Sequence, residues 1–147
     1  MALANMTQEE TNEYNRDHCK RIALELEQYA NGDVYRCPEC NEIITLPDDV
    51  GDKYRCPACG TVHDVDDLEQ LSTWDYLEDA LDFRFLIDSL RDVLAVKILV
   101  TFGGPNIWID TESRAVELYW LTDRASYPLS TDVCDALNEW ADEYLAC

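Results

Sequence analysis

The spacing of apolar residues predicts a helix at each end of the chain. The first is expected from about Thr7 to Ala30, because Thr7 and Glu10 fit a capping box and Asn31-Gly32 can end a helix. Its apolar residues recur with helical spacing on one face: Cys19, Ile22, Ala23, Leu26, Tyr29 and Ala30. The last helix follows a choice of N-caps at residues 130–132. Its apolar stripe, expected to lie across a sheet, is Val133, Ala136, Leu137, Trp140, Ala141, Tyr144 and Leu145.

Between residues 81 and 121 the pattern changes to the alternation that is typical of strands. Two runs of apolar residues alternate with polar ones: Leu81, Phe83, Phe85 and Ile87, then Leu94, Val96, Ile98, Val100 and Phe102. The Gly-Gly-Pro-Asn sequence at 103–106 is a strong turn signal, and two more strands are expected at Ile107–Asp110 and Val116–Leu121. Loops this short cannot hold a parallel crossover, so we expect an antiparallel meander of about four strands.

Residues 34–64 contain short strand-like pieces around two pairs of cysteines. Ile43–Leu46 and Lys53–Arg55 are expected to form a hairpin with residues 47–51 as its turn. A short helical stretch is expected near 66–72, and residues 73–80 continue or restart it. The predicted fold is therefore α+β, with an N-terminal helix (1–32), a metal module (33–64) and an acidic α+β domain (65–147) in which the C-terminal helix packs on the meander.

Four of the seven cysteines form two Cys-x-x-Cys pairs, Cys37 with Cys40 and Cys56 with Cys59, and 15 residues separate the pairs. Each pair can aim two sulfurs at one ion, and this spacing is typical of a four-cysteine zinc site. The segment from about Val34 to His63 resembles the zinc-ribbon family, in which two such turns hold short strands. We expect one structural Zn²⁺ ion, because four thiolates leave no open position for catalysis.

The other cysteine interpretations are less favoured. An odd number of cysteines and the lack of a secretory signal argue against disulfides, and a thioredoxin-type site needs one pair on a βα unit. Cys19 and Cys134 are interpreted as small hydrophobic residues of helix faces, and Cys147 is expected to be exposed. His63 is interpreted as a packing residue and not as a ligand.

The net charge of the chain limits the kinds of ligand and partner that it is expected to bind. The 147 residues carry 31 acidic and 11 basic side chains, a formal net charge of -20. Proteins that bind nucleic acid neutralise phosphates with clusters of Lys and Arg, and no basic stripe occurs here, so direct nucleic-acid binding is not expected. A partner protein with a basic, nucleic-acid-binding surface is the more natural expectation. No apolar run approaches the roughly 18 residues that cross a bilayer, so no membrane contact is expected.

Two groups of carboxylates are candidates for binding such a partner. Four lie along one face of the last helix, opposite its apolar stripe: Asp132, Asp135, Glu139 and Asp142. A second cluster lies within residues 75–82: Asp75, Glu78, Asp79 and Asp82. The competing interpretation is a solvated surface that keeps the protein in solution. The shortage of basic residues favours a use outside the chain, because most of these carboxylates must remain unpaired.

The block Lys97–Ser130, with GGPNIWIDT, VELYW and TDRASYPLS, is similar to uncharacterised small proteins of phages and conjugative elements of gut bacteria. The resemblance implies a mobile-element setting in the cytoplasm of a bacterial host cell, where small acidic proteins block restriction or CRISPR enzymes. The leading hypothesis is a non-enzymatic, anti-CRISPR-like inhibitor or adaptor that occupies the basic channel of a host defence enzyme as a nucleic-acid mimic. No catalytic constellation is recognisable, so an enzyme is not expected. The alternative is a zinc-ribbon transcription accessory or other nucleic-acid-associated protein, with these contacts: Tyr35, Arg36, Lys53, Tyr54 and Arg55.

Overall fold

Helix α1 spans Gln8–Asn31 in the computed structural model, which describes residues 6–146. The predicted capping box is present: the Glu10 amide donates to Thr7 Oγ1 (3.1 Å) and the Thr7 amide donates to Glu10 Oε2 (2.9 Å). Gly32 ends the helix with a left-handed φ of 78°, and a Cβ there would lie 2.6 Å from the side-chain nitrogen of Gln70. The prediction of this helix and its two ends is confirmed.

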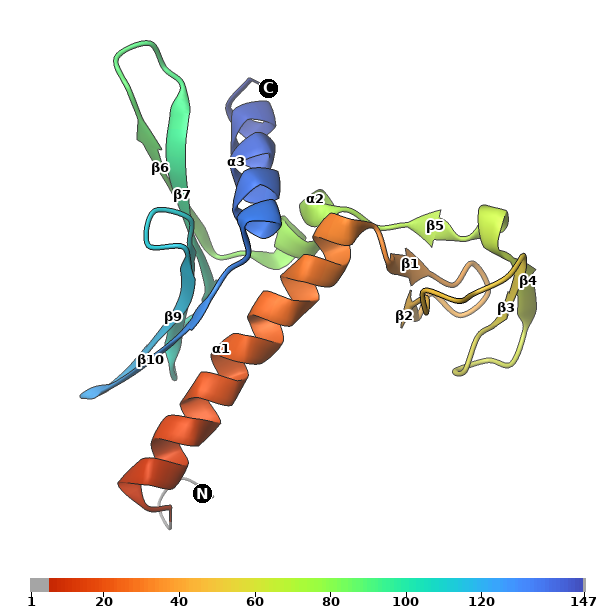
Figure 1. The fold of residues 1–147 in the computed structure, drawn as a ribbon, viewed down its shortest axis with the longest axis horizontal. Helices are drawn as coiled ribbons and strands as arrows, with labels where there is room; N and C mark the ends of the chain where they lie inside the picture. The colour runs from red at the N-terminus through yellow and green to blue at the C-terminus, as the bar shows by residue number, and fades with distance from the viewer. Residues whose placement is uncertain (1–5, 147) are drawn as a thin grey trace.

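A five-stranded antiparallel sheet forms most of the C-terminal half, in the spatial order β10-β9-β8-β7-β6 (Figure 1). Each strand pairs with its neighbours in sequence, so the predicted meander is confirmed. The structure adds a fifth strand to the predicted four. The bounds are β6 Asp82–Ile87, β7 Val93–Thr101, β8 Asn106–Asp110, β9 Ala115–Trp120 and β10 Asp123–Pro128.

The added strand, β10, follows a turn that carries none of the usual hairpin residues. Leu121 adopts a φ of 56° in the two-residue connection from β9, a conformation that hairpins usually give to Asn or Gly. Within β10 only Ala125 and Tyr127 pack against the core. A short, mostly polar strand behind an unusual turn therefore carries little signal in its sequence.

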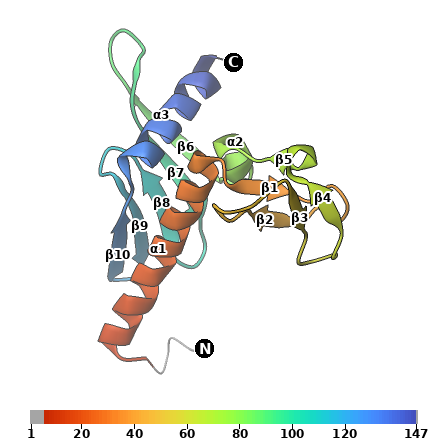
Figure 2. The same ribbon diagram turned by 45° about the vertical axis from the view of Figure 1, so that its right-hand side comes forward.

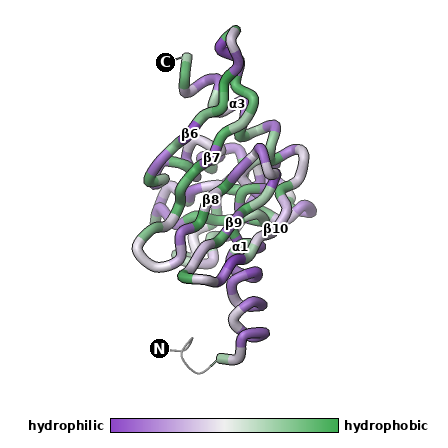
Figure 3. The backbone as a smooth tube through the Cα atoms, turned by 90° about the vertical axis from the view of Figure 1, so that its left-hand side faces the viewer, coloured by the Kyte–Doolittle hydropathy of each residue, from purple (hydrophilic) through white to green (hydrophobic). Residues whose placement is uncertain are grey.

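Helices α1 and α3 cover the same face of this sheet (Figures 1 and 2). Helix α3 spans Thr131–Ala146, and the Val133 amide donates to Ser130 Oγ (3.2 Å), so Ser130 caps the helix. Helix α1 packs along β9 and β10, while α3 packs along β7. The core between the layers contains Cys19, Ile22, Leu26, Val96, Ile98, Ile107, Ile109, Val116, Leu118, Val133, Leu137 and Trp140. No helix within residues 6–146 covers the opposite face of the sheet, which Figure 3 views directly.

Residues 34–64, which we call the ribbon, contain two hairpins, each closed by one cysteine pair. β1 (Val34–Arg36) pairs with β2 (Ile43–Thr45), and β3 (Lys53–Arg55) pairs with β4 (Val62–Asp64). The predicted hairpin between Ile43–Leu46 and Lys53–Arg55 is therefore wrong. Each Cys-x-x-Cys turn reverses the chain by itself, so the strands on its two sides meet locally.

The segment 66–72 is largely extended, so the predicted helical stretch is wrong there. A 3₁₀ turn, η2, covers only Val65–Asp67, and β5 (Glu69–Gln70) then pairs with β1 and extends the ribbon sheet past residue 64. Leu68 is buried in the ribbon core, which draws this segment against the ribbon. Helical structure restarts at α2 (Thr73–Tyr76) and the 3₁₀ turn η3 (Leu77–Asp79).

Candidate metal centre

Two turns of the same backbone shape bring the cysteines together. In the first, the Asn41 amide donates to the Cys37 carbonyl (2.9 Å); in the second, the Gly60 amide donates to the Cys56 carbonyl (2.8 Å). Asn41 and Gly60 hold equivalent positions, and both have left-handed backbone, with φ of 62° and 76°. The residues that shape each turn lie within a few positions of its cysteines, so the sequence specifies both turns locally.

The four predicted ligands, Cys37, Cys40, Cys56 and Cys59, form one cluster. Their sulfur atoms all lie within 4.8 Å of one another. Between the two turns, Cys37 Sγ lies 3.8 Å from Cys59 Sγ, and Cys40 Sγ lies 3.7 Å from Cys56 Sγ. A tetrahedron with metal–sulfur bonds of about 2.3 Å has edges of about 3.8 Å. The cluster could therefore hold one metal ion with tetrahedral coordination.

The electrostatics of the cluster also favour a bound cation. Hydrogen bonds from the Thr61 side chain and backbone lower the pKa of Cys59 to about 6. The backbone hydrogen bond at Glu42 lowers the pKa of Cys40, but desolvation and the three neighbouring sulfurs outweigh it and raise that pKa to about 12. One thiol thus ionises near neutral pH while another keeps its proton, because the sulfurs hydrogen-bond to one another. A bound divalent cation would replace the protons that the sulfurs share.

His63 lies directly beside the ligands. It is on β4, in register with Tyr54, and its Nε2 atom is 3.5 Å from Cys37 Sγ. In the tautomer that carries a proton on Nε2, His63 can donate to Cys37 Sγ without being a fifth ligand. Interpreting His63 as a packing residue misses this contact, and the role of Thr61 is missed as well. In the sequence, only the alternation of polar and apolar residues after the second cysteine turn indicates Thr61 and His63.

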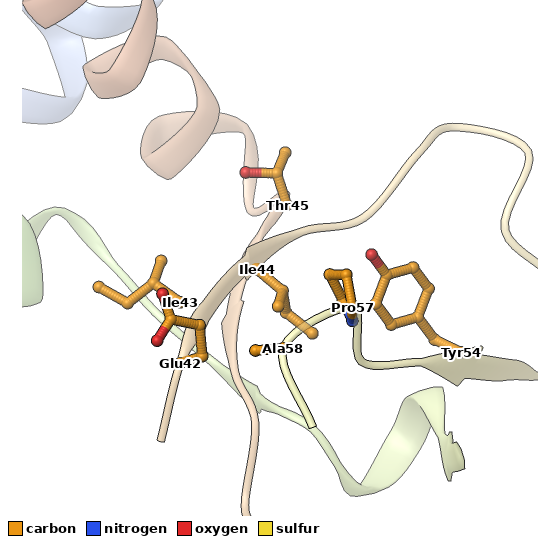
Figure 4. Close-up of a pocket in the computed structure, with 7 residues that line it drawn as sticks. All are labelled: Glu42, Ile43, Ile44, Thr45, Tyr54, Pro57 and Ala58. Atoms are coloured by element: carbon orange, nitrogen blue, oxygen red, sulfur yellow. The ribbon is translucent and has the colours of Figure 1, made fainter. Parts of the chain in front are cut away.

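The ribbon has a small core of its own. Its buried members are Cys37, Ile44, Leu46, Cys56 and Leu68. An open hollow of about 470 Å³ lies between β2 and the second cysteine turn, and Figure 4 shows Ile44, Tyr54 and Pro57 around it. Two of the five buried core residues are ligands, so the cluster and the core depend on each other. So small a core needs an additional tie between the two hairpins.

Two of the three cysteines outside the cluster, Cys19 and Cys134, lie in the core as the sequence predicts. Cys19 and Cys134 are buried in the main core, with 0% and 4% of their surface exposed. Desolvation raises the pKa of Cys19 to about 11 and also raises the pKa of Cys134. Both thiols are therefore neutral at physiological pH. Cys147 lies outside the described residues.

The carboxylates predicted to bind a partner are all exposed, but two of them also have local roles. Asp75 accepts from the Ser72 amide (2.7 Å) in the capping box of α2, and Asp82 pairs with Arg84 (3.3 Å). The other six predicted carboxylates have no hydrogen-bond or ion-pair partner within residues 6–146: Glu78, Asp79, Asp132, Asp135, Glu139 and Asp142. Trp74 Nε1 donates to Glu143 Oε2 (2.8 Å), which joins α2 to α3 and makes the two groups neighbours.

No protein-family model, curated protein or solved structure matches the chain. None of the helices between residues 6 and 146 combines the length and apolar character that a membrane span requires. The functional argument therefore comes from the geometry of the residues themselves.

Proposed function

We propose that the metal ion is Zn²⁺ and that its role is structural. Four sulfur donors at tetrahedral spacing match the ligand preference of zinc, and four protein ligands leave no position for water or substrate. The ion ties two hairpins whose shared core has only five buried residues. Zinc binding therefore contributes directly to the folding of the ribbon.

Metal analysis tests this part of the proposal. Protein purified without chelator is expected to contain one zinc ion per chain, and Cys56→Ser is expected to lose it together with the ribbon fold. Cys134→Ser is the matched control, because Cys134 lies in the main core, outside the cluster. Chain without stoichiometric zinc, or full zinc content in Cys56→Ser, contradicts the proposal.

We also propose that the chain is a non-enzymatic binding protein, an inhibitor or adaptor, that docks on a basic, nucleic-acid-binding surface of another protein. The contact is the acidic surface, defined as Glu78, Asp79, Asp132, Asp135, Glu139 and Asp142. The observation that carries this proposal is that all six are exposed and none has a partner within residues 6–146. Unneutralised charge of one sign costs stability, and a basic partner relieves that cost.

The arrangement on α3 fits a basic channel. Its four carboxylates, from Asp132 to Asp142, extend along about 15 Å of helix, on the side away from the buried Leu137. Such a row places negative charge where a nucleic-acid channel receives phosphates. A host defence enzyme is one protein with such a channel; the resemblance of Lys97–Ser130 suggests it, while the proposal itself needs only the basic channel.

Partner capture from a bacterial lysate, with identification by mass spectrometry, supplies the protein for a quantitative test. Changing all four α3 carboxylates to Asn or Gln is expected to weaken binding and to slow association most. Each exposed ion pair contributes about 1 kcal/mol or less, so the charges act together, and long-range attraction sets the association rate. The matched control changes four exposed ribbon carboxylates and alters the net charge equally: Glu39, Glu42, Asp48 and Asp49.

Competition provides the second measurement. Added DNA or RNA is expected to displace the chain from its partner, and salt is expected to weaken the complex. Binding that survives the α3 changes but fails in the ribbon control would move the contact to the ribbon and contradict the assignment of α3.

The alternative is a nucleic-acid-associated protein that binds through basic residues of the ribbon. The contacts of these basic residues argue against it. Arg36 lies 3.7 Å from Glu69, Lys53 donates to Asp64 (2.9 Å), and Arg55 donates to the Gly60 carbonyl (2.8 Å). All three cations thus have partners inside the ribbon, which supports local charge balance. A gel-shift assay in which Lys53→Gln and Arg55→Gln abolish nucleic-acid binding would revive the alternative.

A further inference from the structure

The face of the sheet opposite α1 and α3, whose backbone Figure 3 views, carries a row of cationic and aromatic side chains that contact one another. The row crosses all five strands, one residue on each: Arg84, Lys97, Trp108, Tyr119 and Arg124. Register places Arg84 opposite Lys97 and Tyr119 opposite Arg124. All of their strand neighbours except Asp123 belong to the core or pack against it, so alternation directs these five outward. We call this set the sheet-face row.

The cations of the sheet-face row lie over its aromatic rings. Arg84 Cζ is 5.1 Å and Lys97 Nζ is 4.9 Å from the centre of the Trp108 ring, and Arg124 Cζ is 5.5 Å from the centre of the Tyr119 ring. Five cation–π contacts are present within residues 6–146, and three of them belong to this row. The row is therefore a concentration of this kind of contact.

Charge on this face differs from that of the rest of the chain. Residues 61–147 contain five basic residues, and three of them stand in the row. The outward carboxylates of these strands, Asp82, Asp110 and Glu117, balance the three cations in formal charge, and each makes a local contact. Asp82 pairs with Arg84, Asp110 accepts from the amides of residues 112 and 113, and Glu117 accepts from the Tyr119 hydroxyl (2.7 Å). Within residues 6–146, Lys97 and Arg124 have no ion-pair partner, although the chain has 31 acidic residues.

We propose that the sheet-face row is a binding platform for single-stranded nucleic acid. Bases would stack on the rings of Trp108 and Tyr119, and backbone phosphates would contact Arg84, Lys97 and Arg124. An open sheet with aromatic rings and flanking cations supplies the two interactions that unpaired strands need. A duplex is excluded from stacking, because its base faces are already covered. The Arg84 side chain is 69% exposed, so it can leave the Trp108 ring and follow a phosphate while a base takes its place.

The two aromatic rings favour single-stranded nucleic acid over an acidic protein segment as the ligand. Carboxylates would use the three cations but leave both aromatic faces without a function, whereas every nucleobase has a face that stacks. The net charge of -20 repels any polyanion at long range. Affinity is therefore expected to come more from stacking than from charge, so the ring variants should lose more binding than the cation variants.

This platform is independent of the acidic surface proposed above, which lies on η3 and α3. Neutralising the four α3 carboxylates is expected to leave binding of a single strand unchanged or to strengthen it, because repulsion falls. The same change weakens partner binding if the proposed function is right. The two proposals can therefore fail separately.

The test is fluorescence anisotropy of a labelled oligothymidine of about 12 nucleotides, titrated with the full zinc-loaded chain at about 50 mM salt. Trp108→Leu is expected to weaken binding about tenfold or more, because it removes the ring and keeps an apolar residue. Trp108→Phe is expected to restore part of the affinity. Lys97→Gln, a surface change that leaves the ring in place, is expected to weaken binding less. Oligouridine of equal length shows whether RNA or DNA is preferred.

The controls are Trp74→Phe on α2 and Arg91→Gln in the β6–β7 connection, which alter the same residue types away from the row. Both are expected to bind like the unchanged protein, and circular dichroism confirms that each variant is folded. No binding of either oligonucleotide, or equal losses in the row variants and controls, overturns the proposal. Binding of an oligoglutamate peptide in place of the oligonucleotides also overturns it and assigns the row to acidic protein segments.

Discussion

Asn15 provides the sharpest test of how the main core is built. Its side chain is 1% exposed, and neither its amide nitrogen nor its amide oxygen has a hydrogen-bond partner within residues 6–146. It lies one turn before Cys19 on the buried stripe of α1, which packs on β9 and β10. A buried polar group without a partner costs about 1–3 kcal/mol. Leu has a side chain of similar size and no such cost.

Asn15→Leu is therefore expected to raise the free energy of unfolding by about 2 kcal/mol, because folding no longer removes an amide from water without compensation. For a chain of about 150 residues this corresponds to a rise in Tm of roughly 4–8 °C. Urea unfolding of the zinc-loaded protein, followed by far-UV circular dichroism, measures the change. Asn12→Leu is the matched control, because Asn12 is exposed on the same helix and its replacement should change stability by about 0.5 kcal/mol or less.

The opposite result would refute this reasoning. If Asn15→Leu lowers the free energy of unfolding while Asn12→Leu does not, the Asn15 amide must make stabilising hydrogen bonds, for example to a buried water molecule. The polar residue would then be part of what defines the packing of α1 on the sheet.

Three further predictions concern buried aromatic and thiol groups. Trp140 is 3% exposed, so Trp140→Ala is expected to lower the free energy of unfolding by about 3–5 kcal/mol in the urea assay. Trp140→Phe is expected to cost much less, because it also removes an indole N–H that has no partner within residues 6–146; equal losses would contradict this. Burial and the Glu25 carboxylate raise the pKa of Tyr76, so its contribution to stability is complete below about pH 10 and falls at higher pH. Tyr76→Phe is expected to reduce that alkaline loss, and an unchanged pH profile of unfolding would exclude Tyr76 as its source. Cys19, with a pKa of about 11, is expected to resist iodoacetamide at about pH 8 until the chain is denatured, and mass spectrometry of labelled native protein checks this.

Local features could be predicted from the sequence because their causes lie within a few residues. The capping box at Thr7 and Glu10 and the glycine at position 32 define α1, and the structure has both. Each pair of cysteines is placed by a turn that depends only on the residues beside it, and the structure then brings the two predicted pairs together. The apolar stripe of α3 likewise follows from a 3.6-residue repeat, although its last members, Tyr144 and Leu145, are 40% and 46% exposed.

Contacts between distant segments were decided only by the tertiary structure. β2 had two possible partners of similar character, and the cysteine turn selected β1. β10 exists because β9 offers a free edge and the core receives Tyr127, neither of which a pattern of polar residues reveals. The charge of the protein is likewise determined partly by the sequence and partly by the tertiary structure. The sequence determines a total of -20, but the sheet decides that Arg84, Lys97 and Arg124 share one face. Total charge is a sum over residues, whereas a local surface depends on which strands pair and in which register.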